Sequence, residues 1–134
     1  MSAYSDLTRK FHQAMNIPVD APFEANLLAL RQTLIAEETK ELFDEVQQAI
    51  QEIQKNGHVC AKTHENMMKE LADVLFVSFG FAVSFGFPMD EIFKRVYESN
   101  MSKLGDDGKP IYRADGKITK SPNYRKPDLS DLVK

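Results

Sequence analysis

Cysteine is almost absent from this chain, since Cys60 is the only one among 134 residues. A single thiol excludes an internal disulfide framework and fits a reducing compartment, where we expect it to be inert. The N-terminus lacks the charged and then apolar layout of a signal peptide. The longest apolar run, residues 74–87, is about five residues too short for a membrane span. We therefore expect a soluble, cytoplasmic protein with no membrane partner.

An excess of basic charge is also lacking. The net charge is −3 and the pI is near 5.6, and no segment offers the dense basic face that nucleic-acid phosphates require, so we expect no nucleic-acid partner. The charge is uneven along the chain. Residues 1–102 hold nine Lys/Arg against fifteen Asp/Glu, whereas residues 103–134 hold eight against five. A mildly basic tail of this kind is suited to closing over a polyphosphate.

Several motifs of nucleotide and metal chemistry are missing. The chain has neither GxxxxGK[ST] nor GxGxxG, so a nucleotide would be held by metal and side chains rather than by a glycine-rich loop. His64-Glu65 resembles the start of a zinc-protease helix but lacks the second histidine. No Glu-x-x-His pair supports a di-iron bundle. We expect His12 and His58 to be structural or solvated.

Four helices are predicted, over about residues 6–15, 23–56, 63–85 and 89–104. Ser5 or Asp6 can cap the first, and Thr63 the third. The second has no Pro or Gly, and Gly57 follows it where a C-terminal cap is expected. Gly105 closes the fourth. Four helices joined by short loops indicate an all-α fold, a four-helix bundle occupying residues 1–104.

Residues 105–134 have a different character and form a second part of the chain. Asp107-Gly108 and Asp115-Gly116 are turn signals on either side of residues 111–113, and two prolines prevent regular structure farther on. We expect an irregular, ordered C-terminal arm with a small hairpin, packed on the helical domain or on a neighbouring subunit. A chain of this size is small for a deep active site, so we expect an oligomer.

Two acidic clusters are the most informative feature of the sequence. They are Glu37-Glu38-x-x-Glu41 and Glu70-x-x-Asp73, about thirty residues apart on predicted helices. When the second helix is plotted at 100° per residue, its leucines lie on one arc of the helix surface. Its glutamates continue that same arc. Glu70 and Asp73 are the exceptions in a third helix that is apolar on all sides after Leu71. Converging carboxylates repel one another unless cations lie between them, and oxygen ligands favour Mg²⁺ or Mn²⁺, which commonly bind phosphates.

Simpler interpretations compete with a metal site. A lone EExxE is most often a solvated helix face, and an acid in an apolar helix can be a structural residue bonded to a hydroxyl. The conjunction of the two clusters favours the metal site. On the fourth helix, Asn100 falls within the inward stripe with Lys103 at its edge, which suits a ligand of mixed polarity. The basic residues of the arm can equally be ordinary loop charges.

Three motifs occur in order along the chain: EExxE on one helix, ExxD on the next and Asn100-x-x-Lys103 on the fourth. With these motifs in this order, the chain resembles the all-α nucleoside triphosphate pyrophosphohydrolases. That superfamily includes MazG, dimeric dUTPases and phosphoribosyl-ATP pyrophosphohydrolase. The resemblance covers about residues 23–104. The segment 99–113 resembles the tail of MazG-like, phosphoribosyl-ATP-pyrophosphohydrolase-like single-domain proteins. The resemblance implies a bundle of the MazG-like type.

The resemblance also implies a mechanism and a set of site residues. The magnesium ligands, with manganese possible as the metal, would be Glu37, Glu38, Glu41, Glu70 and Asp73. The ions would grip a nucleoside triphosphate and water would attack the α-phosphorus, releasing a nucleoside monophosphate and pyrophosphate. Glu38 is the favoured base. Substrate contacts would come from Asn100 and Lys103, with added positive charge from Lys109, Arg113 and Lys120 of the arm.

Members of the superfamily form dimers or tetramers, so we expect a homodimer or homotetramer that pairs through the third helix. The cellular role implied is removal of non-standard or excess nucleotides, and the sequence does not choose the base. Two alternatives stay open. One is a non-catalytic helical oligomer that binds nucleotide or a protein partner, and the other is a phosphoribosyl-ATP pyrophosphohydrolase.

Overall fold

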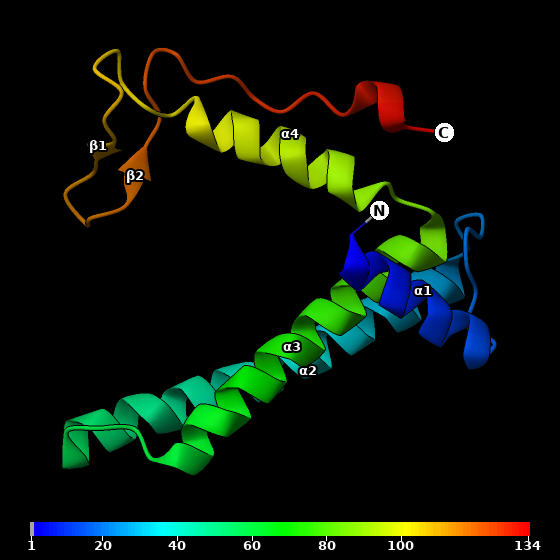
Figure 1. Cartoon of the computed structure of the whole chain (residues 1–134), viewed down its shortest axis with the longest axis horizontal. Coiled ribbons are helices and arrows are strands. Elements are labelled where there is room, and N and C mark those ends of the chain that lie inside the picture. Colours follow the sequence, from blue (N-terminus) through cyan, green and yellow to red (C-terminus); the bar gives the residue numbers. More distant parts are fainter. Residues whose placement is uncertain (1) are drawn as a thin grey trace. The chain divides into compact units, whose positions relative to one another are not determined.

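A computed structural model describes residues 2–134, which form two compact units, the first ending at Phe87 and the second running from Pro88 to Lys134. The first unit holds α1 (Ala3–Ala14), α2 (Ala25–Asn56) and α3 (Ala61–Phe85). The second holds α4 (Met89–Met101), β1 (Ile111–Tyr112), β2 (Ile118–Thr119) and a short 3₁₀ helix, η1 (Ser130–Leu132) (Figure 1). The predicted all-α class with four helices is confirmed.

Two predictions about N-terminal helix caps are wrong. Ser2, not Ser5 or Asp6, caps α1, because the Ser2 Oγ accepts a hydrogen bond from the backbone N–H of Ser5 at 3.2 Å. At the start of α3 the N-cap position is Cys60, whose side chain makes no capping bond, and Thr63 lies inside the helix. Sequence spacing alone could not separate these neighbouring cap candidates.

The α2–α3 connection is held by a side chain from the end of α2. One carboxylate oxygen of Glu52 accepts a hydrogen bond from the Cys60 backbone N–H at 2.8 Å, and the other accepts one from the Thr63 hydroxyl at 2.5 Å. Gly57 ends α2 with a φ of 82°, as its predicted capping role requires. The two long helices therefore form a closed hairpin, and they run side by side in Figure 1.

Aromatic side chains stabilise the end of the first unit where α1 and the 15–24 connection meet α3. Phe11 of α1 lies edge-on to Phe76 of α3, with ring centroids 5.1 Å apart. Farther along α3, Phe85 contacts both Phe23 and Phe81 at centroid separations of 5.2 Å. Aromatic pairs at such distances stabilise the fold beyond the contribution of the apolar area that they bury. They fix α1 and the connection against the C-terminal half of α3.

The second unit consists of α4 and the arm. The Ser99 hydroxyl of α4 donates to the Arg125 carbonyl oxygen at 2.7 Å, and the Ser121 hydroxyl donates to the Ser102 carbonyl oxygen at 3.1 Å. Strands β1 and β2 pair antiparallel, which confirms the small hairpin. The helix ends at Met101 rather than at Gly105, whose N–H instead donates to the Lys109 carbonyl oxygen within the arm. The compact units divide after Phe87, so α4 groups with the arm rather than with the first three helices.

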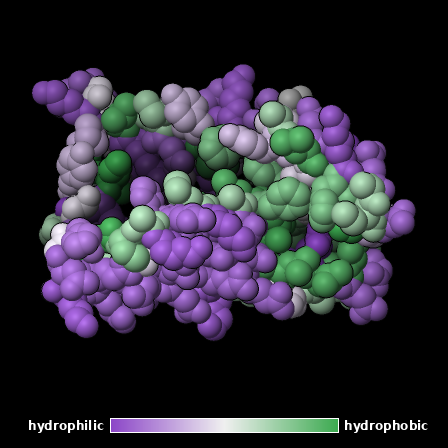
Figure 2. Space-filling model, turned by 60° about the horizontal axis from the view of Figure 1, so that its bottom comes forward, coloured by the Kyte–Doolittle hydropathy of each residue, from purple (hydrophilic) through white to green (hydrophobic). Residues whose placement is uncertain are grey.

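The third helix is less enclosed than its sequence suggests. Leu71 and Leu75 are each 51% exposed in the single chain, so the expectation that α3 is buried on all sides is wrong for one subunit alone. Apolar atoms form broad surface areas beside hydrophilic ones in the space-filling view (Figure 2). Among the described residues no single helix is both long and apolar enough to cross a membrane, and α3 with α4 satisfies that test only as a pair.

The Glu52 cap yields a prediction about acid stability. Hydrogen bonds from Thr63 and Cys60 lower the pKa of Glu52 to about 2 from an ordinary 4.5. Because the folded pKa is depressed, the stability that Glu52 contributes is fully present above pH 4.5 and is lost as the pH falls toward 2. Glu52→Gln should lower Tm at pH 7 and flatten the loss of stability over this window, measured by circular dichroism at 222 nm.

The matched control is Glu65→Gln, which removes an equal charge from an exposed position near the start of α3, where Glu65 faces Lys62 at 3.9 Å. This control should leave Tm and its pH dependence unchanged within error. Equal behaviour of the two variants would show that Glu52 is not a structural cap.

Candidate metal centre

Four carboxylates from two helices converge in the first unit. Glu38 and Glu41 of α2 meet Glu70 and Asp73 of α3, and one carboxylate oxygen of each lies within 4.8 Å of the others. On each helix the two acids are three residues apart, a spacing that projects side chains from the same side. The α2–α3 hairpin sets the two acidic pairs opposite each other, as the sequence predicted.

Burial places these charges in an unfavourable environment. Glu38, Glu70 and Asp73 are half-buried and Glu41 is exposed. Burial raises the pKa of Glu38, and the negative charges of Glu41, Asp73 and Glu70 add to that shift. Burial likewise raises the pKa of Glu70, although its hydrogen bond from Lys69 opposes the shift. The cluster therefore holds more negative charge than its surroundings compensate.

Two oxygens in the cluster have no hydrogen-bond partner. The Oε2 atoms of Glu38 and Glu70 are buried and unpaired among the described residues. A buried carboxylate oxygen without a donor is costly, and a hard divalent cation would satisfy it. The donor set consists of carboxylate oxygens only, which matches hard cations and excludes a zinc site of the thiolate or imidazole type. The residues present therefore fit a divalent metal.

Lys69 supplies partial compensation that sequence analysis missed. Its ammonium lies 2.7 Å from Asp73 Oδ2 and 3.4 Å from Glu70 Oε1, and these contacts raise its own pKa. The side chain is 64% exposed and flexible in type, so a cation can displace it. The spacing Lys69-x-x-x-Asp73, an i,i+4 pair, was the signal available in the sequence.

The structure leaves one predicted ligand out of the cluster. Glu37 is exposed and does not belong to the group formed by the other four. Neighbouring residues on a helix point about 100° apart, so Glu37 and Glu38 cannot share one direction. A metal-binding role for Glu37 stays a prediction.

The predicted substrate-binding residues lie in the second unit, on α4 and the arm: Asn100, Lys103, Lys109, Arg113 and Lys120. Asn100 is exposed. Arg113 already pairs with Asp115 across 2.5 Å, and the Lys120 ammonium sits 4.6 Å from the centre of the Tyr124 ring. Contact between these residues and a substrate stays a prediction.

A pocket of about 280 Å³ adjoins the cluster, and Glu38 and Asp73 contribute to its lining. The pocket also contains two residues that sequence analysis did not select as site residues, His12 and Arg31. His12 is almost fully buried, which confirms its expected structural placement, whereas His58 is exposed. No periodic pattern in the sequence points to Arg31, because a lone arginine on a long helix is normally a surface residue.

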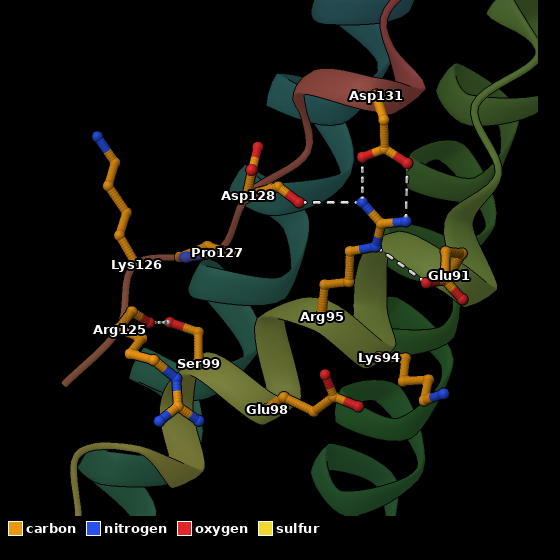
Figure 3. A pocket seen from close by; sticks show the side chains of 10 residues that line it. All are labelled: Glu91, Lys94, Arg95, Glu98, Ser99, Arg125, Lys126, Pro127, Asp128 and Asp131. Carbon is orange, nitrogen blue, oxygen red and sulfur yellow. Dashed lines mark hydrogen bonds and ion pairs between the residues drawn. The ribbon is translucent and has the colours of Figure 1, made fainter. Parts of the chain in front are cut away.

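A second pocket, of about 360 Å³, lies within the second unit (Figure 3). Two of its carboxylates are engaged by one arginine: the Arg95 guanidinium pairs with Asp131 at 2.5 Å and with Glu91 at 2.9 Å, and it donates to the Asp128 carbonyl oxygen at 3.0 Å. Figure 3 shows Arg95 at the centre of these bonds. The arrangement fastens the end of the arm to α4.

The cluster predicts that a divalent metal stabilises the protein. Adding Mn²⁺ or Mg²⁺ to chelator-treated protein should raise Tm by roughly 5 °C or more at saturating metal, measured by calorimetry. Glu38→Gln and Glu70→Gln should remove most of that rise, and neither should destabilise the metal-free protein, since each relieves repulsion. Because protons compete with the metal for Glu38, the rise should be larger at pH 8 than at pH 5.5.

Asp44→Asn is the matched control, because Asp44 is an exposed acid of α2 that pairs with Lys40 at 2.8 Å, outside the cluster. It should keep the full metal-induced rise. A rise that survives Glu38→Gln and Glu70→Gln would place the metal elsewhere and contradict the assignment.

Comparison with known proteins agrees with this geometry. Residues 4–100 match the model of the family described as phosphoribosyl-ATP pyrophosphohydrolase. None of the curated proteins compared with the chain matches it. Among solved structures, the chain is similar to a "putative NTP pyrophosphohydrolase" from Exiguobacterium sp. 255-15, with 26% identity, coverage of 94% of this chain and 89% of that one, and a TM-score of 0.46. The family match spans both acidic helices and most of the chain, so the protein belongs to the phosphoribosyl-ATP pyrophosphohydrolase family.

Proposed function

We propose that this protein hydrolyses a nucleoside triphosphate to a nucleoside monophosphate and pyrophosphate in a Mg²⁺-dependent reaction. The observation that carries the proposal is the group of four carboxylates on α2 and α3, with ligand atoms within 4.8 Å of one another and two buried oxygens unpartnered. A site this acidic repels a triphosphate unless metal ions bridge them. Membership of a pyrophosphohydrolase family supports the reaction type.

Mg²⁺ is the metal we propose, with Mn²⁺ as an effective substitute, and the ligands are Glu38, Glu41, Glu70 and Asp73. When bound, such a cation neutralises phosphate charge, orients the leaving group and lowers the pKa of water. The exposed Glu37 is a candidate for an additional ligand. Glu37→Gln separates the alternatives, because only a ligand role would make metal affinity depend on it.

Glu38 is the proposed general base. In the reaction the water oxygen forms a bond to the α-phosphorus, the bond from that phosphorus to the α,β-bridging oxygen breaks, and pyrophosphate leaves. The water proton passes to the Glu38 carboxylate. Glu38 belongs to the acidic cluster and also lines the adjoining pocket, which places its carboxylate beside the proposed substrate site.

The alternative substrate is phosphoribosyl-ATP, which the family description names. Its triphosphate presents the same bond to the same carboxylates, so the cluster alone does not separate the two. For ordinary triphosphates we propose a role in removing non-standard or excess nucleotides.

Pyrophosphate release tests the proposed reaction. Purified protein is assayed with canonical and modified nucleoside triphosphates and with phosphoribosyl-ATP, in Mg²⁺ and in chelator. Release should require the metal and be confined to one or a few substrates. Glu38→Gln should lower kcat roughly 10²- to 10⁴-fold, because it removes both a ligand and the base. Asp44→Asn should retain wild-type kcat.

Failure of every substrate in the presence of metal would contradict the enzymatic proposal. That result would favour a non-catalytic helical oligomer that binds nucleotide or a protein partner. A Glu38→Gln variant with full kcat would instead keep the reaction and reject Glu38 as its base.

We also propose that the protein is a homodimer or homotetramer that pairs through an apolar surface of α1 and α3. Between them, Tyr4, Leu7, Leu75 and Phe76 line an apolar groove of about 180 Å³, and Leu75 is 51% exposed in the single chain. Apolar side chains of this number are seldom left in water, and a second copy of the surface would cover them.

Light scattering coupled to size-exclusion chromatography measures the assembly. The wild type should elute at twice or four times the 15.3 kDa chain mass. Leu75→Glu should shift it toward the monomer, because a charge would be buried in the interface. Gln47→Glu, which adds the same charge at an exposed position of α2 outside the groove, is the control and should leave the mass unchanged. A monomeric wild type at micromolar concentration would contradict the proposal.

A further inference from the structure

Arg31 is a buried cation without an acidic partner. Its residue is 5% exposed, its Nε makes no hydrogen bond, and no carboxylate of the described residues pairs with its guanidinium. Burial lowers its pKa. Leaving a buried charge unpaired is strongly unfavourable unless a ligand completes it, and a guanidinium offers its donors in a planar fork. A polar group held in this state points to a binding function.

A single neighbour holds the guanidinium. The Arg31 Nη1 donates to His12 Nε2 at 3.2 Å, while His12 Nδ1 lies 3.2 Å from the Pro18 carbonyl oxygen. These contacts require a neutral imidazole with the proton on Nδ1, and burial lowers the pKa of His12, which favours that neutral form. One N–H of Nη1 is thereby committed, and no described residue accepts a hydrogen bond from Nη2, whose donors remain for a ligand.

Gly80 of α3 makes room for this pair. A Cβ atom at Gly80 would lie 2.9 Å from Arg31 Nη1, closer than real Cβ contacts, and 3.1 Å from His12 Nε2, tighter than most of them. The glycine lies inside a helix, where it costs stability relative to alanine. Its presence is explained by the space that the guanidinium occupies.

The pocket beside Arg31 continues toward the carboxylates. Arg31, Leu34 and Glu38 follow one side of α2, and all three line the 280 Å³ pocket with Val77 and Asp73 of α3. Arg31 precedes Glu38 by two helical turns, or roughly 10 Å along the axis. Between the two polar ends the walls are apolar, and Phe11 and Phe76 contribute their rings. The pocket is polar at both ends and apolar between them.

We infer that Arg31 binds the keto edge of the nucleobase and so selects keto bases over amino bases. The inference rests on the proposed function and deepens it. With the triphosphate at the carboxylates, the sugar and base extend along the apolar walls toward Arg31. The guanidinium there donates to a carbonyl oxygen such as O6 of guanine or O4 of uracil. Adenine and cytosine place an amino donor at the same position, against the arginine donors.

The chemistry of the pocket favours a base over a phosphate at Arg31. A phosphate would be surrounded by Phe11, Leu34 and Phe76, and these side chains cannot complete its hydrogen bonds. The faces of a planar base can pack against the same apolar walls, and its edge can accept hydrogen bonds from the guanidinium. The carboxylates with bound metal already provide the phosphate site.

The test compares substrates matched in size that differ at one edge, GTP against ATP and dUTP against dCTP. For the wild type, kcat/KM should favour the keto member of each pair roughly 10- to 100-fold. Arg31→Met should bring the ratio close to one, mainly by raising KM for the keto member. Arg31→Lys, which keeps the charge and loses the fork, should restore only part of the preference.

Two further measurements keep the inference falsifiable if Arg31→Met does not fold. Gly80→Ala displaces the guanidinium without removing it and should lower the same ratio. In chelator, where the phosphate site is inactive, millimolar uridine should raise the Tm of the wild type more than cytidine does. Where Arg31→Met does fold, inhibition by inorganic tripolyphosphate should be equal in this variant and the wild type.

The outcomes separate the two proposals. No pyrophosphate release from any substrate by the wild type overturns the proposed function. Release without a keto preference, or a preference that persists in both Arg31→Met and Gly80→Ala, overturns the role of Arg31 and leaves the reaction intact. Loss of tripolyphosphate inhibition in Arg31→Met would show that Arg31 binds phosphate, which also overturns the inference.

Discussion

Repulsion among four carboxylates is the constraint on which the first unit depends. Glu38, Glu41, Glu70 and Asp73 present oxygens within 4.8 Å of one another, and the pKa values of Glu38 and Glu70 are raised as a result of burial and mutual charge. Two long helices capped at their turn by Glu52 force the acids together. Such an arrangement is unfavourable by itself, and a divalent cation between the carboxylates would relieve it.

The same helix pair accounts for the specificity of the proposed site as well as for its chemistry. From the carboxylates, the facing sides of α2 and α3 pass through Leu34 and Val77 to Arg31 and Gly80. Polar groups lack partners at both ends: Glu38 and Glu70 each have an unpartnered oxygen at one, and the Arg31 Nε makes no hydrogen bond at the other. In the proposed complex, metal ions would bind the oxygens and the base would accept a hydrogen bond from the guanidinium.

The sequence predicted the elements and the acids for simple physical reasons. Long segments without Pro or Gly define α2 and α3, and carboxylates in an apolar helix such as Glu70 and Asp73 are conspicuous because burying them is costly. Helix ends were less predictable, since Ser2 and Ser5 are equally good caps and only the fold decides between them.

The sequence did not predict the roles of Arg31, His12 and Lys69 in the site, because these roles come from tertiary contacts. Arg31 and His12 are nineteen residues apart and meet only when α1 packs beside α2 and α3. Conversely, Glu37 satisfied the motif but is exposed, because one position along a helix turns a side chain away from its neighbour. The substrate-binding role of Asn100 and Lys103 stays a prediction.

The most direct measurement is anomalous diffraction from crystals grown with Mn²⁺ and a nucleoside triphosphate whose α,β-bridging oxygen is replaced by an imido group. The account predicts manganese peaks between Glu38, Glu41, Glu70 and Asp73, with the phosphates coordinated to them and the Lys69 ammonium moved away from Asp73. Phosphates bound elsewhere, or a cluster without manganese at saturating concentration, would contradict it.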